Sequence, residues 1–355
     1  MQFPISKTKT EGKERTFNLT DPVERNEYFH YKADEEIDKL KDHVRENSFI
    51  VYLLGKKNSG KGTYSKMFAE IINPERIDHF SVGDMIRAVS TDIQDPEKKI
   101  EIEDYLKKEY RGWVPAKDLI RAIETRDTKT LLPTELILAL VKREIAKRPK
   151  KTIFIDGFPR EMDQVSYSLF FRDLIGFRND QDVLAFIDVP TNVIEERIKW
   201  RRICPICNTS RSIKLLPTAK VGYDEAAKEF YLICDNSKCS GYGSQKLGPK
   251  EGDELGIAPL KDRLELDQKL MEKAMTLYGI PKVYLRNALP ADTAKDYVDD
   301  YELTPEFEFS WDGQEVKTDQ KPWMVKDDEG ITSYSLMAPA VVVSLIKQLS
   351  KVLGL

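Results

Sequence analysis

A glycine-rich loop at residues 55–63, directly after an apolar run, constrains the fold of this chain more than any other feature. Residues 49–54 read Phe-Ile-Val-Tyr-Leu-Leu, which is typical of a strand buried on both faces of a parallel sheet. The loop reads Gly-Lys-Lys-Asn-Ser-Gly-Lys-Gly-Thr and opens a helical pattern at 60–72. Glycines let a backbone wrap closely around an anion, whose oxygens then bind N–H groups of the loop and of the helix start. The unit therefore predicts a phosphate-binding site at the end of a strand.

Further strand and helix patterns alternate along the chain and extend this unit into a sheet. Apolar runs at 152–156 and 183–189 have the character of the first strand. Helical patterns lie around them, at 133–146, 162–174 and 191–203. Strands that alternate with helices form parallel sheets with helices on both faces. We therefore expect an α/β fold with a doubly wound parallel sheet, of the P-loop NTPase type.

Two segments interrupt this alternation, and two terminal regions extend it. Residues 88–132 are charged and helix-rich, whereas residues 204–258 are rich in Gly, Pro, Asn and Asp, as in a small module of hairpins and turns. The remaining predicted elements are a helix at 33–46, a helix at 259–278, a strand at 306–311 and an amphipathic helix at 339–353. The sequence leaves the role of the terminal regions open between bracing the core, which is the default, oligomerisation and binding of another partner.

Charge and composition exclude several classes of protein. The 355 residues include 56 Lys and Arg against 60 Asp and Glu, a net charge of −4, so no basic surplus indicates a nucleic-acid partner. Apolar runs stay far below the roughly 20 residues that span a bilayer, and the first residues do not resemble a signal peptide. We therefore expect a cytoplasmic protein with no membrane partner. The three histidines, His30, His43 and His79, are too widely separated to indicate a histidine-based catalytic centre.

Charged residues near the ends of the predicted elements indicate phosphate chemistry. Lys61 is placed to reach the β- and γ-phosphates of a nucleotide, and Thr63 follows one residue later than the strict pattern requires. Asp156 ends a predicted strand, where a carboxylate anchors Mg²⁺ directly or through water. Guanidinium groups match phosphate oxygens, and arginines gather at element ends: Arg87, Arg160, Arg197, Arg201, Arg202 and Arg263. The spacing of Arg197 and Arg201 predicts that both lie on one face of the helix at 191–203.

The cysteines form a second pattern. All four lie within one segment, as the pairs Cys204 and Cys207, then Cys234 and Cys239. Two cysteine pairs that close around Zn²⁺ make a tetrahedral structural site with no open position. Free thiols and a single disulfide are the alternatives. A small module with little core gains most of its folding energy from such a metal, so we expect structural zinc.

Together these motifs resemble the nucleoside monophosphate kinases, and specifically adenylate kinases of the long type with a zinc-binding lid. The resembling segments occur in the order of the family and cover roughly residues 49–280. They are the loop at 55–63, Ser-Val-Gly-Asp-Met-Ile-Arg at 81–87, Asp-Gly-Phe-Pro-Arg at 156–160 with Gln164, Arg-Ile-Lys-Trp-Arg-Arg at 197–202, and Lys-Asp-Arg-Leu at 261–264. A lid arginine of the family has Lys250 as its nearest counterpart here.

The resemblance implies reversible phosphoryl transfer from ATP to a nucleoside monophosphate, AMP above all, by in-line transfer with Mg²⁺ and an arginine cluster. It divides the chain into an N-terminal extension (1–48), a kinase core (49–286) and a C-terminal extension (287–355). Within the core it implies a monophosphate-binding arm (82–133) and a zinc lid (204–258). We expect a monomer that binds ATP and AMP but no nucleic acid.

The resemblance also assigns roles to individual residues. The catalytic set is Lys61, Arg160, Arg197, Arg201 and Arg263. The ATP-binding set is Gly55, Ser59, Gly60, Lys61, Gly62, Thr63, Arg197 and Arg202. The monophosphate-binding set is Ser81, Val82, Arg87, Gly157, Arg160 and Gln164. Asp156 and Thr63 would hold Mg²⁺ through water, and Cys204, Cys207, Cys234 and Cys239 would bind zinc.

Two other functions remain open from the sequence. A UMP/CMP kinase has the same fold. Gln164 favours adenine, because family members that read pyrimidines tend to carry Asn there, whereas Val82 replaces a Thr common in adenylate kinases. A nucleotide-dependent switch whose cysteine module is a zinc ribbon for nucleic acid is more distant. Acidic residues offset the Lys and Arg of that module, which argues against it.

Overall fold

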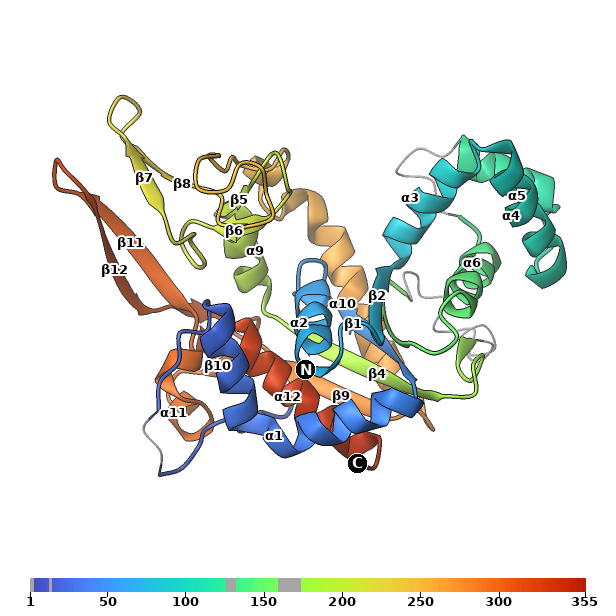
Figure 1. Ribbon diagram of the computed structural model, residues 1–355, viewed down its shortest axis with the longest axis horizontal. Helices are drawn as coiled ribbons and strands as arrows, with labels where there is room; N and C mark the ends of the chain where they lie inside the picture. Colours follow the sequence, from blue (N-terminus) through green and yellow to red (C-terminus); the bar gives the residue numbers. More distant parts are fainter. Residues whose placement is uncertain (1–2, 13–14, 126–131, 159–173) are drawn as a thin grey trace.

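The computed structural model describes residues 3–12, 15–125, 132–158 and 174–355. In this part of the chain, five parallel strands form a central sheet in the order β2-β3-β1-β4-β9 (Figure 1). They are β1 (Phe49–Gly55), β2 (Ile77–Ser81), β3 (Thr152–Asp156), β4 (Gln181–Asp188) and β9 (Lys282–Arg286). The predicted strands are the three interior ones, and the doubly wound α/β class is confirmed. The edge strands β2 and β9 were not predicted, because they are short and only partly buried and carry polar residues.

Both terminal regions cover one face of this sheet. Helices α1 (Pro22–Glu46), α2 (Lys61–Ile72), α9 (Thr191–Lys199) and α12 (Ala338–Val352) pack there in a common core. Helix α12 contacts α1, α2 and strand β9, so the C-terminal end of the chain completes this layer. Helix α1 begins earlier than the predicted 33–46, because Asp21 caps it ahead of Pro22, and a kink at Ala33 divides it.

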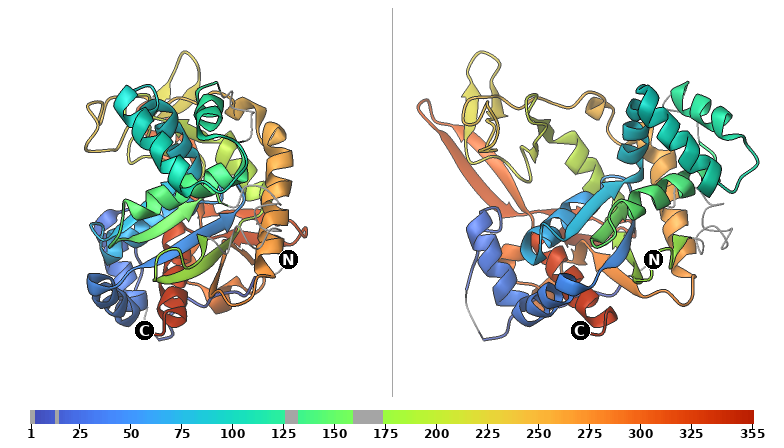
Figure 2. Two further views of the ribbon diagram at one scale, coloured as in Figure 1. Left: turned by 90° about the vertical axis from the view of Figure 1, so that its right-hand side faces the viewer. Right: turned by 45° about the vertical axis from the view of Figure 1, so that its right-hand side comes forward.

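The opposite face carries a second layer of helices. Its members are α3 (Val82–Asp92), α4 (Pro96–Glu109), α5 (Ala116–Glu124), α6 (Thr134–Ala146) and α10 (Lys261–Met275), whose apolar faces share one core cluster. Figures 1 and 2 show α3, α4 and α5 projecting together from the sheet, away from the cysteine segment (residues 204–258). The helix predicted at 162–174 falls almost entirely outside the described residues. None of the described helices is long and apolar enough to cross a membrane.

The cysteine segment consists of short strands and turns. Strand β5 (Arg201–Ile203) pairs with β6 (Ser210–Ser212), and β7 (Val221–Asp224) pairs with β8 (Glu229–Leu232). The short helices η1 (Asp253–Leu255) and η2 (Ala258–Leu260) lead into α10. The predicted helix at 191–203 was too long, because the chain leaves the helix at Trp200 and enters β5. Arg197 and Arg201 therefore do not share a helix face, and that prediction was wrong.

The C-terminal region adds small sheets and a long hairpin. Its elements are β10 (Ala288–Pro290), α11 (Ala294–Tyr297), η3 (Asp300–Glu302), β11 (Pro305–Trp311), β12 (Val316–Pro322), β13 (Met324–Lys326) and β14 (Thr332–Ser335). The predicted strand at 306–311 is confirmed as β11. Figure 1 shows the β11–β12 hairpin beside the cysteine segment. Trp311 stacks on Tyr223 with ring centroids 5.2 Å apart, and Glu306 lies 3.0 Å from the Lys214 ammonium.

Candidate active site

A pocket of about 510 Å³ opens at the carboxyl ends of β1, β2 and β3. Because the sheet is parallel, the last residues of these strands lie at the same end of the sheet. Ligands of open α/β sheets bind outside the carboxyl ends of the strands. Six of the predicted site residues line the pocket: Gly55, Lys61, Ser81, Asp156, Gly157 and Arg263. The structure thus brings together residues that are more than 200 positions apart in the sequence.

The loop at 55–63 has a conformation that depends on glycine. Gly60 has φ of 100° in the left-handed region, and α2 begins at the next residue. Gly55 packs so closely that a Cβ atom there would lie 2.8 Å from the carbonyl oxygen of Ile187. The N–H groups of Thr63 and Tyr64 bond back to the Gly60 carbonyl at 2.9 and 3.0 Å. The loop therefore turns tightly into α2, and the dipole of that helix points at the pocket.

Lys61 folds back onto this loop. Its Nζ atom donates to the carbonyl oxygens of Gly55 at 2.8 Å and of Lys56 at 2.9 Å. The same atom lies 3.6 Å from the carboxylate of Asp156 at the end of β3. The ammonium is thus held above the loop by two carbonyl oxygens and, at longer range, by the Asp156 carboxylate. Charged acceptors bind an ammonium more strongly than neutral ones, so an anionic phosphate would displace the carbonyls. Asp156 offers the hard carboxylate oxygen that Mg²⁺ prefers.

Asp267 also lines the pocket, and it is not among the residues predicted from the sequence. Its Oδ2 accepts the backbone N–H of Lys57 at 2.8 Å, and its Oδ1 lies 2.7 Å from the Arg263 guanidinium. Burial raises the pKa of the Asp267 carboxyl, and the charge of Arg263 opposes that rise. Asp267 lies one helical turn after Arg263 on α10, and this i,i+4 spacing was the available signal. Asp267 thus ties the glycine-rich loop at 55–63, the phosphate loop, to α10 and orients Arg263.

The residues predicted to bind the monophosphate are only partly described. Ser81 ends β2 and caps α3, since its Oγ accepts the N–H of Asp84 at 3.0 Å. Val82 is fully buried in the core. Arg87 is exposed and pairs with Asp84 on the same helix. Arg160 and Gln164 lie outside the described residues.

The other predicted arginines do not line the pocket. Arg197, near the end of α9, points its Nη2 at the side-chain oxygen of Asn287, 3.4 Å away. Arg201 forms a two-pronged pair with Asp253, with 2.7 Å between Nε and Oδ2. Arg202 donates to the Arg201 carbonyl at 2.9 Å. The predicted arginines are therefore dispersed in this conformation. Among the described residues, Arg263 is the predicted arginine that lines the pocket.

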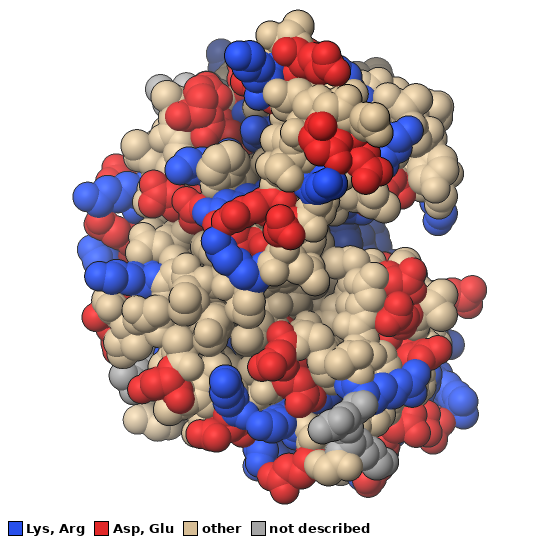
Figure 3. Space-filling view, turned by 90° about the vertical axis from the view of Figure 1, so that its left-hand side faces the viewer, with Lys and Arg blue, Asp and Glu red and all other residues tan. Residues whose placement is uncertain are grey.

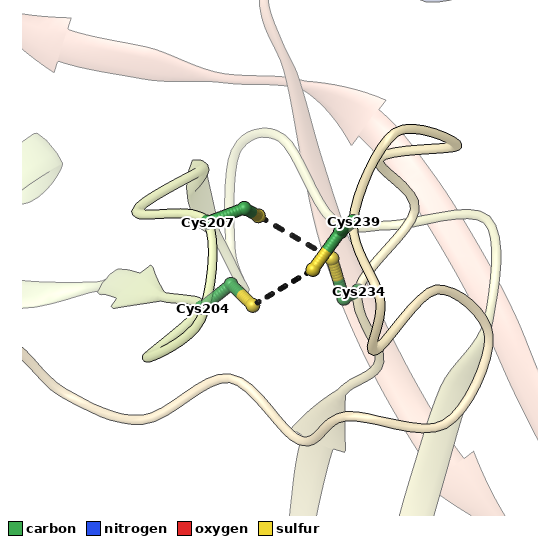
Figure 4. Close-up of side chains that lie close together, drawn as sticks. All are labelled: Cys204, Cys207, Cys234 and Cys239. Carbon is green, nitrogen blue, oxygen red and sulfur yellow. Dashed lines mark hydrogen bonds between the residues drawn. The ribbon is translucent and has the colours of Figure 1, made fainter.

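The four cysteines converge on one point, as Figure 4 shows. All four Sγ atoms lie within 4.8 Å of one another. The Cys207–Cys234 and Cys204–Cys239 sulfur distances are 3.7 and 3.9 Å. Tetrahedral Zn²⁺ with bonds of about 2.3 Å separates its sulfurs by about 3.8 Å, so the cluster fits zinc. The described thiols are free, with no disulfide among them.

The cysteine sites differ in their electrostatics. Hydrogen bonding with Thr209 lowers the pKa of the Cys207 thiol to about 6. Burial instead raises the pKa of Cys234 to about 12. A bound dication would favour the thiolate at both positions, which suits thiolate ligation.

Comparison with known proteins agrees with this geometry, although no family model matches the chain. The adenylate kinase of Clostridium beijerinckii is 28% identical over 64% of this chain and 86% of its own length. That of Clostridium botulinum (strain 657 / Type Ba4) is 30% identical over 62% of this chain and 81% of its own. That of Clostridium novyi is 31% identical over 50% of this chain and 70% of its own length. The pocket at the end of the glycine-rich loop and these relatives lead to one conclusion: the chain belongs to the adenylate kinase family, a family of nucleoside monophosphate kinases.

Proposed function

We propose that the protein catalyses ATP + AMP ⇌ 2 ADP by in-line transfer of the γ-phosphoryl group, with Mg²⁺ bound to ATP. One observation carries the proposal: Lys61, Asp156 and Arg263 line one pocket at the end of a glycine-rich loop, in a chain of the adenylate kinase family. Gly55, Ser59, Gly60, Gly62 and Thr63 would surround the phosphates of ATP together with Lys61.

The reaction would need charge stabilisation rather than a general base. A nucleoside monophosphate has a second pKa of about 6, so at neutral pH the acceptor is largely a nucleophilic dianion. Lys61 would leave the carbonyls of Gly55 and Lys56 and bind the transferring group. Mg²⁺, when bound with ATP, would neutralise phosphate charge, and Asp156 and Thr63 would hold it through water. Catalysis then amounts to holding two anions in line.

Closure of the arm (82–133) and the lid (204–258) would complete the site. In the present conformation Arg201 is engaged by Asp253, and Arg197 and Arg202 lie outside the pocket. We propose that closure exchanges the Asp253 carboxylate for phosphate oxygens at Arg201 and brings Arg197 and Arg202 to the nucleotides. Arg160, which lies outside the described residues, would bind the acceptor phosphate. Exclusion of water at the same moment would suppress hydrolysis, because water competes with the acceptor.

Zinc would have a structural role in the lid. Four thiolates fill a tetrahedral shell, so the metal would keep no position for water or substrate. Cys204, Cys234 and Cys239 are buried in the small core of the segment, together with Leu232 and Leu247. The metal would therefore fix the shape of the lid that carries Arg201 and Arg202 at its entry.

The identity of the acceptor rests on the family pattern. Gln164 favours AMP, whereas the buried side chain of Val82 favours the alternative of a UMP/CMP kinase, because it offers no hydroxyl to a base. Initial rates with ATP and AMP, CMP, UMP, GMP or dTMP would decide between them, with Lys61→Met as the inactive control. We expect the highest kcat/KM with AMP. A higher value with CMP or UMP would refute AMP specificity while leaving the kinase class intact.

The switch hypothesis predicts a different result in the same assay, namely no ADP production that depends on a monophosphate. The surface gives it little support. On the face in Figure 3, Lys and Arg are interspersed with Asp and Glu instead of forming a basic stripe. Within the cysteine segment, Arg211 pairs with Asp235 and Lys246 lies near Asp224. Nucleic-acid binding usually requires an unpaired basic surface.

A further inference from the structure

Lys56, the second residue of the phosphate loop, has a buried charge that residues from distant elements satisfy. Its side chain is 5% exposed. The ammonium donates to the hydroxyl of Thr191 at 3.1 Å and to the carbonyl of Val189 at 3.4 Å. It also donates to the carboxylate of Asp328, in the turn between β13 and β14. A buried ammonium needs a counter-charge, and Asp328 supplies it.

Asp328 also caps helix α9. The residue before this helix is Pro190, whose side chain offers no cap. The Oδ1 of Asp328 accepts the N–H of Thr191, the first residue of the helix, at 2.7 Å. A carboxylate at a helix N-terminus satisfies an otherwise unpaired donor and interacts well with the helix dipole. One carboxylate thus joins the phosphate loop to the first turn of α9, which carries Arg197.

The turn that presents Asp328 is itself held in shape. The carboxylate of Asp327 accepts the N–H groups of Glu329 at 3.0 Å and Ile331 at 2.9 Å. The backbone carbonyl of Lys326 accepts the side chain of Asn192 at 2.9 Å, a second contact with α9. Burial tends to raise the pKa of the Asp328 carboxyl, but the hydrogen bonds from Lys56 and Thr191 outweigh it and lower the pKa. Asp328 is therefore ionised and fixed in place.

The other side of the loop is anchored independently. Asp267 of α10 holds the N–H of Lys57, while the carbonyl of Lys56 accepts the Lys61 ammonium. The loop is thus tied at two consecutive residues, to α10 through Lys57 and to the C-terminal region through Lys56. A second pocket of about 560 Å³, lined in part by Lys56, Thr191 and Asp328, borders this junction, and it contains none of the predicted site residues.

We propose that Asp328 is a positioning residue for phosphoryl transfer, which fixes the phosphate loop relative to α9 and so places Lys61 and Arg197 for catalysis. The inference rests on the proposed function, because it takes the loop at 55–63 as the ATP site. It gives the C-terminal extension a part in catalysis. Displacement of a catalytic group by about 1 Å costs up to about 10²-fold in rate, so a loosened tether affects turnover.

The test compares Asp328→Ala, Asp328→Asn and the double variant Lys56→Met/Asp328→Ala with the wild type. We expect Asp328→Ala to lower kcat by about 10-fold or more and to raise the KM for ATP, while the KM for AMP stays within about twofold. Asp328→Asn keeps an acceptor for the N–H of Thr191, so its kcat should fall less than that of Asp328→Ala. If Asp328→Ala does not fold, Asp328→Asn and the double variant carry the test.

The double variant separates positioning from stability. Asp328→Ala should lower the melting temperature, because it leaves the Lys56 ammonium buried without a counter-charge. Removal of that ammonium in the double variant should restore the melting temperature, yet kcat should stay low because the loop remains untethered. Recovery of kcat together with the melting temperature would overturn the proposal, as would wild-type kinetics in Asp328→Ala. Glu308→Gln on the β11–β12 hairpin is the matched control, because it removes an exposed acidic charge of the same extension, whose ion-pair partner is Lys321 on that hairpin. An inactive wild type would instead refute the proposed function.

Discussion

Helix α12 offers a direct test of whether the C-terminal region belongs to the core of the enzyme. Ile346 is fully buried in the layer that α12 forms with α1 and α2. Truncation of a buried Ile to Ala costs about 2–5 kcal/mol, from the lost transfer free energy and the cavity that remains. We therefore expect Ile346→Ala to lower the free energy of unfolding by about 3 kcal/mol.

The whole helix contributes far more. It buries six large aliphatic side chains, at Val341, Val342, Val343, Leu345, Ile346 and Leu349. At about 1.5–3 kcal/mol each, their burial sums to on the order of 10 kcal/mol. Typical domains are stable by only about 5–15 kcal/mol in total. A chain that ends before α12 should therefore not fold.

Urea denaturation followed by circular dichroism measures both effects. Lys351→Ala, an exposed position of the same helix, is the matched control and should change the free energy of unfolding by less than about 0.5 kcal/mol. The reasoning is refuted if Ile346→Ala costs less than about 1 kcal/mol. A soluble, active chain lacking residues 338–355 would refute it equally.

Three further predictions concern the site, the metal and pH. Lys61→Met should lower kcat by about 10²–10³-fold with an unchanged circular dichroism spectrum; wild-type kcat/KM in a folded variant would remove Lys61 from the site. The purified protein should hold one Zn²⁺ per chain by elemental analysis, and Cys207→Ser should lower metal content and melting temperature; metal far below one equivalent in the wild type would contradict this. Burial raises the pKa of Asp182 to about 6 from an ordinary 3.8, so the native state holds this proton more tightly than the unfolded state does. Its ionisation should therefore cost about 2 kcal/mol of stability as pH rises from about 4 to about 6. The difference in unfolding free energy between Asp182→Asn and the wild type should grow in favour of the variant over that range, and a flat difference would disprove the shift.

The sequence predicted the elements whose patterns are local. The interior strands have continuous apolar runs because helices cover both of their faces, and the loop at 55–63 has glycines because its backbone must turn closely. The four cysteines were predicted to converge, and the structure brings them together. The edge strand β2 escaped prediction because, with a neighbour on one side only, it keeps polar residues such as Asp78 and His79.

The end of α9 shows the limit of periodicity. The apolar pattern at 191–203 continues past Lys199, but pairing between β5 and β6 takes over at Arg201. Strand pairing depends on a partner elsewhere in the chain, so a helical period cannot reveal it. This single boundary decided whether Arg197 and Arg201 face the same way.

The sequence by itself thus determined the phosphate loop, the buried strands and the cysteine pairs, because each depends on neighbours a few residues away. Only the tertiary structure decided that the C-terminal region completes the core and touches the loop. Lys56 and Asp328 lie 272 positions apart, and Glu306 meets Lys214 across the hairpin and the cysteine segment. No local pattern marks such pairs, since a lone Asp in a turn looks the same whether it faces solvent or a buried ammonium. Their meeting follows from how the sheet and its covering helices pack.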